Sequence, residues 1–314
     1  MRPVAPSLRS LRGARAGSVA TLIVGLAAFG PSGPSAAAQT TASARTLSAA
    51  TVEDLQAAFS SGALTSEALV EMYLARIEAY DQRGPILNTV LALNPRALDR
   101  ARALDEERRA SGPRSALHGI PVVLKDNVDT ADMPTTAGSV LLDGSLPPDD
   151  AFLVRRLREA GAIILAKVNM SEFASGATMS SVGGWIRNPH DVTRTPSGSS
   201  GGTGAAIAAA FAQLGIGTDT GGSVRGPSTS NGIVGLKPTL GLVSRDGIVP
   251  LALSFDTGGP MARSVYDVAA MLGALVGVDP ADPATAASEG QTLADYTAVL
   301  DATALEGARI GVAR

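Results

Sequence analysis

The chain contains no cysteine among its 314 residues. Disulfide bonds, a thiol nucleophile and cysteine-ligated zinc or iron–sulfur centres are therefore excluded. Histidine is almost as scarce, with only His118 and His190, and the zinc-binding pattern H-E-x-x-H does not occur. A histidine-rich metal site is disfavoured for that reason, and we expect neither a metal ion nor a cofactor.

Lysine is also rare. Lys125, Lys167 and Lys237 are its only occurrences, so arginine carries nearly all of the positive charge. The formal net charge is −3, and because the first 38 residues hold four arginines and no acid, the remainder is more acidic still. A mildly acidic body argues against a nucleic-acid partner, which needs a basic face. Apolar residues at 45% and charged residues at 18% are typical of a globular chain with a sizeable core.

The amino terminus has the order of segments found in a secretory signal peptide. Arginines precede an apolar run over residues 18–29, and small residues follow it as far as Ala36-Ala37-Ala38. The run is too short to span a bilayer comfortably. We expect residues 1–38 to be removed, residues 39–50 to form a linker, and the mature protein to be exported to the periplasm or the medium without stable membrane association. An uncleaved anchor is the alternative.

Helical and extended patterns alternate from residue 51 onward. Thr51 is suited to cap the first helix, and Thr65-Ser66-Glu67 is expected to start the second. Further helices are expected over residues 95–110 and 149–160. Strands are expected over residues 90–93, within 119–127, and over 162–168. This alternation predicts an α/β fold with a largely parallel or mixed sheet.

Ligands in such folds gather at the carboxyl ends of the strands. Lys125, Lys167 and Asp219 all stand at apparent strand ends. These three charged side chains are therefore candidates for a site at one edge of the sheet.

Two serines in glycine-rich settings are candidate nucleophiles. One group is Gly198-Ser199-Ser200-Gly201-Gly202, the other is Thr218-Asp219-Thr220-Gly221-Gly222-Ser223, and an apolar run of helical length over residues 205–214 separates them. Glycines allow backbone N–H groups to converge on a ligand, so a hydroxyl among them can lie beside its own oxyanion hole. A flexible linker or a phosphate loop is the alternative, although no Walker or G-x-G-x-x-G pattern fits.

The base that would activate such a serine is not a histidine in the usual order. Gly198-x-Ser200-x-Gly202 matches the nucleophile elbow of α/β-hydrolases, but that fold needs its histidine after the serine. Both histidines here precede it, so we expect them to be structural. Lysine is the remaining common choice, and it acts as a base only when burial or a nearby cation keeps it neutral. Lys125 follows an apolar strand and fits a buried position, while Lys237 is the alternative, in a setting typical of a turn.

Several of these stretches, in this order, resemble the amidase signature family of serine hydrolases. The matching stretches are residues 119–127, 197–202, 217–227 and 235–239, within a resemblance that covers residues 51–314. Residues 241–250 and 256–260 look especially like the peptide-amidase branch. The resemblance implies an amidase-signature domain over residues 51–314, with a mixed central β-sheet covered by helices on both faces.

The resemblance also implies a Ser–cisSer–Lys triad, with Lys125 as base, Ser199 as the middle serine and Ser223 as nucleophile. By the same resemblance the oxyanion would be bound by the backbone N–H groups of Thr220, Gly221, Gly222 and Ser223. Asp219, Arg225 and Ser200 would support the site. The implied activity is hydrolysis of a carboxylic or peptide C-terminal amide to an acid and ammonia or an amine, through an acyl-enzyme.

Two features depart from the family pattern. Ser197 stands where the family usually has glycine, and the chain stops at Arg314 although family members continue well beyond this point. Residues 308–313 look like the start of a strand, so we interpret the chain as lacking its carboxyl-terminal part. The alternatives to an exported amidase are an amidotransferase A-subunit-like protein, against which the signal peptide argues, and a non-catalytic remnant.

Overall fold

The computed structural model describes residues 46–312, and the chain separates into two units, residues 1–47 and 48–314. The expected signal peptide and most of the expected linker lie outside the described residues, so the fold described here is that of the second unit. Ala50, the last residue of the expected linker, is buried. Its carbonyl accepts a hydrogen bond from Gln213 Nε2 at 2.8 Å, so the packed body already includes this residue.

The helices and strands alternate along the chain as expected. The helices are α1 (Val52–Ser60), α2 (Ser66–Tyr80), α3 (Ala97–Ser111), α4 (Phe152–Glu159), α5 (Gly201–Ala208), α6 (Arg225–Asn231) and α7 (Val265–Leu275), with short 3-10 turns at η1 (Val140–Leu142), η2 (Glu172–Ala174), η3 (Pro283–Ser288) and η4 (Thr297–Val299). The strands are β1 (Val90–Leu93), β2 (Pro121–Lys125), β3 (Ile163–Val168), β4 (Met179–Ser180), β5 (Gly184–Trp185), β6 (Leu214–Asp219), β7 (Val234–Gly235) and β8 (Thr257–Ala262). Within residues 46–312, no helix has the length and apolar character needed to cross a membrane.

Side-chain caps fix the start of the first two helices. Thr51 accepts a hydrogen bond from the backbone N–H of Asp54, and the Asp54 carboxylate accepts one from the backbone of Thr51, which is a complete capping box. Thr65 caps α2 through the backbone N–H of Ala68. Both helix starts therefore agree with the prediction from local sequence.

The main sheet is mixed, with strand order β1-β3-β2-β6-β8-β7. The three central strands β3, β2 and β6 are parallel, whereas β1, β8 and β7 pair antiparallel with their neighbours. Every residue of β2, β3 and β6 is buried, which is usual for strands covered on both faces. Because β2 and β6 are adjacent and parallel, their carboxyl ends, Lys125 and Asp219, meet at the same edge.

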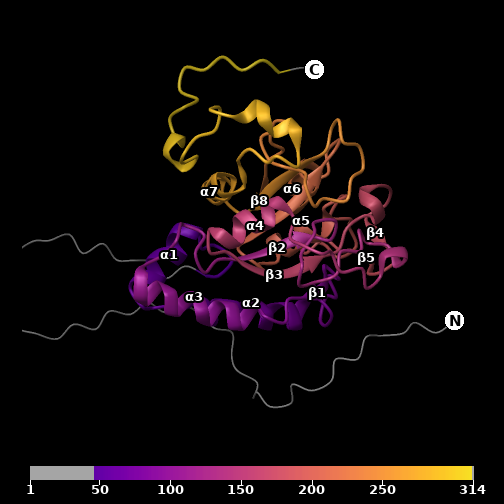
Figure 1. Cartoon of the computed structure of the whole chain (residues 1–314). Coiled ribbons are helices and arrows are strands. Elements are labelled where there is room, and N and C mark those ends of the chain that lie inside the picture. Colours follow the sequence, from indigo (N-terminus) through magenta and orange to yellow (C-terminus); the bar gives the residue numbers. More distant parts are fainter. Residues whose placement is uncertain (1–45, 313–314) are drawn as a thin grey trace, which may run out of the picture. The chain divides into compact units, whose positions relative to one another are not determined.

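Helices cover both faces of this sheet (Figure 1). A side chain at Gly258 of β8 would meet Leu153 of α4, whereas a side chain at Gly215 of β6 would meet Ile207 of α5. Gly258 pairs with Thr218 of β6, and residues 215 and 218 of one strand face opposite sides. Thus α4 and α5 lie on opposite faces, and the predicted α/β fold with a mixed, doubly covered sheet is confirmed.

The structure corrects two predictions about element boundaries. The expected helical run over residues 205–214 is divided, because α5 begins at Gly201 and ends at Ala208, while Leu214 already belongs to β6. The chain reverses at Ala210, which has a positive φ of 53°. The expected strand near the carboxyl end does not form in residues 308–312, which are exposed and pair with no neighbouring strand.

Candidate active site

Lys125 lies at the end of β2 with its ammonium group fully buried. Its Nζ is 2.6 Å from Ser199 Oγ, 2.7 Å from Thr218 Oγ1 and 3.4 Å from the carbonyl oxygen of Thr218. Burial lowers the pKa of Lys125 from 10.5 to about 7, although Asp219 and Asp256 act in the opposite direction. A lysine in this setting is partly neutral at neutral pH and can accept a proton from the serine hydroxyl beside it.

Ser199 and Ser200 are adjacent in sequence but have different partners. The peptide bond between Gly198 and Ser199 is cis, and the Ser199 hydroxyl contacts Lys125. The Ser200 hydroxyl instead lies 3.2 Å from both the N–H and the carbonyl oxygen of Thr218. The Ser199 hydroxyl is therefore hydrogen-bonded to the buried lysine, whereas the Ser200 hydroxyl connects the start of α5 to the end of β6 by hydrogen bonds.

The second glycine-rich stretch lies next to the first. The backbone N–H of Ser200 donates to the carbonyl oxygen of Ser223 at 3.1 Å. Ser223 is half-buried, and within residues 46–312 its hydroxyl makes no hydrogen bond. Its hydroxyl is thus available to a substrate at the exposed side of the site.

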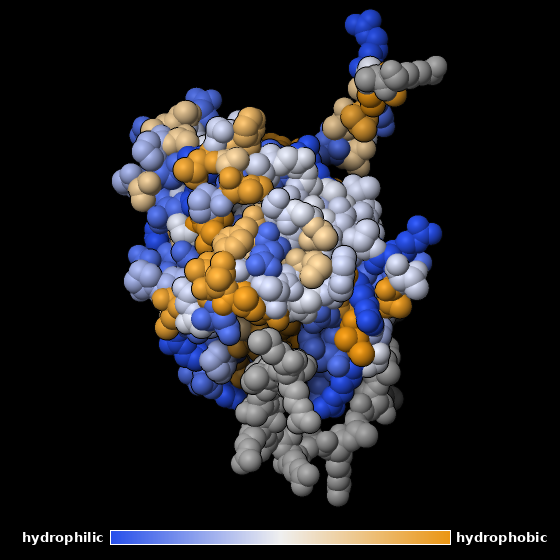
Figure 2. All heavy atoms as spheres, turned by 90° about the vertical axis from the view of Figure 1, so that its right-hand side faces the viewer, coloured by the Kyte–Doolittle hydropathy of each residue, from blue (hydrophilic) through white to orange (hydrophobic). Residues whose placement is uncertain are grey.

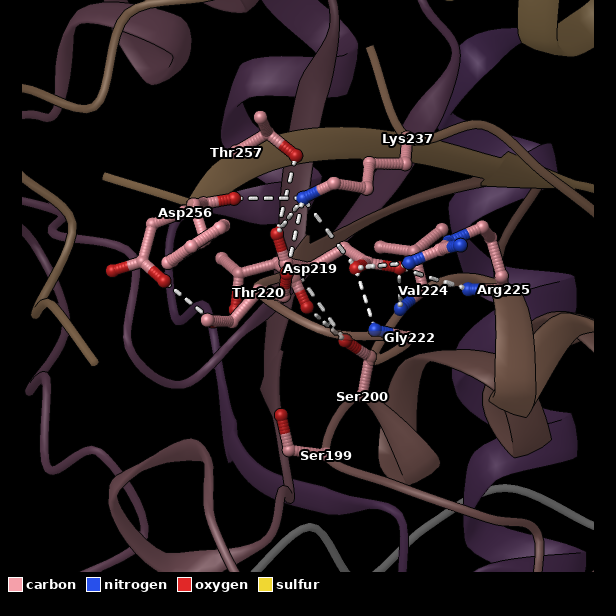
Figure 3. Close-up of polar contacts among 12 residues, drawn as sticks. Ser199, Ser200, Asp219, Thr220, Gly222, Val224, Arg225, Lys237, Asp256 and Thr257 are labelled. Carbon is pink, nitrogen blue, oxygen red and sulfur yellow. Dashed lines mark hydrogen bonds and ion pairs between the residues drawn. The ribbon is translucent and has the colours of Figure 1, made fainter. Parts of the chain in front are cut away.

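The buried carboxylate of Asp219 organises the loop that leads to Ser223 (Figure 3). It accepts hydrogen bonds from the backbone N–H of Gly222 at 2.7 Å and of Val224 at 3.0 Å, and from the Arg225 guanidinium at 3.1 Å. Burial alone would raise the pKa of Asp219, but the hydrogen bonds from Arg225, Val224 and Gly222 hold it well below its usual range. The carboxylate is therefore ionised at neutral pH.

This arrangement changes the set of available oxyanion donors. Gly222 was one of the four expected N–H donors, but its N–H already donates to Asp219. Across the described residues, the N–H groups of Thr220, Gly221 and Ser223 have no protein acceptor. Three of the four expected donors are therefore free to bind an anion.

Ser197 has the backbone conformation that favours glycine. Its φ is +63°, in the left-handed region that glycine adopts without steric cost. This explains why the resemblance leads one to expect glycine at this position. The chain nevertheless forms the same turn with serine.

The two histidines make structural contacts, as the sequence predicted. His118 is buried, with Nε2 2.9 Å from the carbonyl oxygen of Leu104 and Nδ1 accepting from the backbone N–H of Arg114. Burial lowers the pKa of His118, which favours this neutral form. His190 Nε2 lies 2.9 Å from the carbonyl oxygen of Asn231. Neither ring contacts Lys125 or the serines.

Lys167 also stands near a strand end, but it belongs to a different cluster. The register pairs Lys167 with Leu124 and Val168 with Lys125, so the two lysines face opposite sides of the sheet. Lys167 Nζ donates to Thr135 Oγ1 at 2.8 Å and lies 3.4 Å from Asp126. Its role is to hold the loop after β2 against β3.

Sequence reasoning did not single out two polar residues beside Lys125. Thr218 Oγ1 contacts the lysine, and Asn127 Nδ2 donates to the same hydroxyl at 3.1 Å. Both are buried. Asn127 lies two residues after Lys125, and Thr218 directly precedes Asp219. Their closeness in sequence to charged residues at strand ends is the feature from which they could have been predicted.

Metal coordination finds no support in the described part of the chain, where no three His, Cys, Asp or Glu residues group closely enough to hold an ion. Apolar side chains are exposed at several places, among them Leu253 and Phe255 in the segment before β8, Phe173 in η2 and Trp185 in β5. Figure 2 shows apolar patches on the face that lies at the right of Figure 1, where β4 and β5 are placed.

Comparison with known proteins gives a consistent picture. The sequence matches the Amidase family over residues 68–314. A probable amidase of Arabidopsis thaliana is 42% identical over 273 residues, which cover 84% of this chain and 53% of the relative. The A-subunit of the glutamyl-tRNA(Gln) amidotransferase of Rhodopirellula baltica is 45% identical over 256 residues, covering 81% of this chain and 50% of the relative.

Among solved structures, the peptide amidase from Stenotrophomonas maltophilia superposes with a TM-score of 0.77 at 53% sequence identity, over 79% of this chain and 52% of that protein. The chain thus spans about half the length of the relatives it matches. The family match over most of the sequence and the agreement in fold lead to one conclusion: this chain belongs to the amidase family.

Proposed function

We propose that the chain carries the catalytic centre of an amidase that hydrolyses a carboxamide through a Ser–cisSer–Lys triad. The observation that carries the proposal is the fully buried Lys125, with a pKa of about 7, 2.6 Å from Ser199 Oγ. A buried lysine costs stability, and this one contacts hydroxyl groups without contacting a carboxylate that would offset the cost. In the proposal Lys125 is the base, Ser199 the relay and Ser223 the nucleophile.

The reaction would proceed in two halves. Ser223 gives its proton to Ser199 as its Oγ bonds to the amide carbonyl carbon, and Ser199 gives its own proton to neutral Lys125. The carbonyl oxygen becomes an oxyanion that the N–H groups of Thr220, Gly221 and Ser223 can bind. When the C–N bond breaks, the relay returns a proton to the leaving amine. Water then attacks the Ser223 ester with the same relay as base and releases the acid.

The proposed substrate is a carboxylic or peptide C-terminal amide. It is supported by the 53% identity to a peptide amidase and by the exposed apolar side chains on loops of the same chain. The second candidate is an amidotransferase A-subunit-like activity, because several relatives with that name are 43–46% identical. A non-catalytic remnant is the third candidate.

A phosphonate probe separates an enzyme from a remnant. Purified chain is expected to gain the mass of one fluorophosphonate adduct, on the peptide that contains Ser223, because the relay activates only this hydroxyl. Mass spectrometry of the intact and digested protein would show it. An unlabelled, folded chain would support the remnant. If the chain is labelled, ammonia release from a peptide amide without tRNA would favour the amidase over the amidotransferase.

We further propose that the protein is exported after removal of residues 1–38. The support is the sequence of the segment: four arginines, an apolar run and Ala36-Ala37-Ala38. Expression of the sequence from Met1 in a bacterium is expected to yield a periplasmic product that begins at Gln39. Amino-terminal sequencing of that product checks the prediction, and a product that retains Met1 would refute it.

A further inference from the structure

Lys237 is a cation at the site that the proposed mechanism does not use. It follows β7, and its side chain is about one-quarter exposed. Its Nζ donates to the carbonyl oxygens of Asp219 at 2.6 Å, Phe255 at 2.7 Å and Thr220 at 3.4 Å (Figure 3). Nζ also lies 3.6 Å from the Asp219 carboxylate. An ammonium has three protons, and here each has a backbone carbonyl to bind.

Two of these carbonyls determine the direction of the free N–H donors. In a planar trans peptide unit the C=O and N–H bonds point in opposite directions. The carbonyl of Asp219 shares a peptide unit with the N–H of Thr220, and the carbonyl of Thr220 shares one with the N–H of Gly221. Because Lys237 holds both carbonyls, both N–H groups point away from Lys237.

Packing does little to fix this part of the loop. A side chain at Gly221 or Gly222 would meet no atom within 4 Å, and Gly222 has a φ of 140°. Such backbone can rotate at little steric cost, so its orientation depends on hydrogen bonds. The Asp219 carboxylate fixes the N–H of Gly222. Lys237 binds the carbonyls of the two preceding peptide units. The Asp219 carbonyl is also held by the Thr257 hydroxyl at 3.3 Å and by the pairing of β6 with β8, so the peptide unit between Thr220 and Gly221 is the one that depends most on Lys237.

A third contact connects the loop to the neighbouring segment. Lys237 holds the carbonyl of Phe255, while the next residue, Asp256, accepts a hydrogen bond from the Thr220 hydroxyl. Asp256 also accepts from the backbone N–H groups of Leu251 and Ala252 at 2.8 Å. The segment 251–256 and the loop of the site are therefore fixed relative to each other at Thr220.

We propose that Lys237 is a positioning residue that directs the backbone N–H groups of Thr220 and Gly221 toward the oxyanion of the acyl-transfer step. The proposal rests on the proposed function, because it assigns a use to these two N–H groups. It also explains why this lysine differs from Lys125: Lys237 contacts backbone carbonyls and a carboxylate, and none of its contacts is a serine hydroxyl.

The test compares three variants of the purified chain. Lys237→Met removes the donors at similar length, and Lys237→Arg keeps several donors. Lys167→Met is the matched control, because it removes a buried lysine that also donates to a backbone carbonyl, that of Pro134. Fluorophosphonate acylation rates, and kcat and KM for a peptide amide, are measured on folded protein. Amide ¹H–¹⁵N shifts and hydrogen exchange of Thr220 and Gly221 are measured in parallel.

We expect Lys237→Met to slow acylation and lower kcat by about 10²-fold or more, the usual effect of losing one oxyanion donor. The change in KM should be much smaller, because the N–H groups act on the transition state. Lys237→Arg should recover at least about tenfold of the loss, and Lys167→Met should change the rate less than about threefold. The amide signals of Thr220 and Gly221 should move in Lys237→Met and stay in place in Lys167→Met.

Unchanged Thr220 and Gly221 amides in Lys237→Met would overturn the proposal. Equal rate losses in Lys237→Met and Lys167→Met would overturn it too, because they would indicate a general structural effect. If the unaltered chain resists the probe altogether, the proposed function fails. The amide measurements still decide whether Lys237 orients the loop in that case.

Discussion

Replacing Ser223 with alanine is expected to abolish fluorophosphonate labelling and to lower amide hydrolysis by about 10⁴-fold or more. In the proposal, the Ser223 hydroxyl is the only group that forms a covalent bond with the substrate. It is half-buried, and the backbone hydrogen bond between Ser200 and Ser223 holds it beside the first serine loop. Removing it leaves the oxyanion donors in place, so substrate affinity should change far less than the rate. Intact-mass labelling and progress curves for ammonia release provide the measurement.

Two neighbouring serines serve as controls for this assignment. Ser199→Ala removes the hydroxyl 2.6 Å from Lys125, and should slow acylation by about 10²–10⁴-fold, the range typical of lost proton transfer. Ser200→Ala removes a hydroxyl bonded to the backbone of Thr218, and should keep the rate within about tenfold. Labelling that persists in Ser223→Ala, or is lost in Ser200→Ala but kept in Ser199→Ala, would contradict the assignment.

Replacing Lys125 with methionine is expected to remove activity while making the fold more stable. The lysine must be neutral to accept a proton, and its pKa is about 7. The activity of the unaltered protein should therefore rise about tenfold per pH unit below pH 7 and level off above it. The Lys125→Met variant should lose this pH-dependent activity. Rate measurements from pH 5 to 9 test both statements.

The stability effect follows from proton linkage. The pKa of Lys125 lies below that of an unfolded lysine, so between pH 7 and 10.5 the unfolded chain binds more protons than the folded one. The free energy of unfolding of the unaltered protein should therefore rise with pH across this window. At pH 7 and below, the buried lysine costs roughly 5 kcal/mol at about 1.4 kcal/mol per pKa unit.

Methionine removes this cost but also two hydrogen bonds, to Ser199 and Thr218, at about 1 kcal/mol each. A net gain of about 3 kcal/mol is expected at pH 6, and it should shrink toward pH 10. Urea unfolding at both pH values measures it. Lys167→Met, which leaves the Asp126 carboxylate without its ion pair, should instead be destabilising. A Lys125→Met variant less stable than the unaltered protein at pH 6 would show that burial of the charged Lys125 side chain does not destabilise the fold.

The features that local sequence determined are those that depend on neighbouring residues. Thr51 and Thr65 cap their helices through residues three positions away. The central strands could be predicted because continuous apolar residues favour burial on both faces. The family could also be recognised from the order of the sequence motifs, because that order is a property of the sequence alone.

Tertiary structure decided what the charged and hydroxyl groups contact. Ser199 and Ser200 look alike in sequence, but only Ser199 reaches Lys125, 74 residues away. The N–H of Gly222 looks equivalent to its neighbours until the buried Asp219 carboxylate accepts it. The fold gives the three lysines different contacts. Lys125 contacts a serine hydroxyl, Lys167 lies beside a carboxylate, and Lys237 donates to backbone carbonyl oxygens. Such contacts join residues far apart in the chain, and their geometry is fixed only when the sheet assembles.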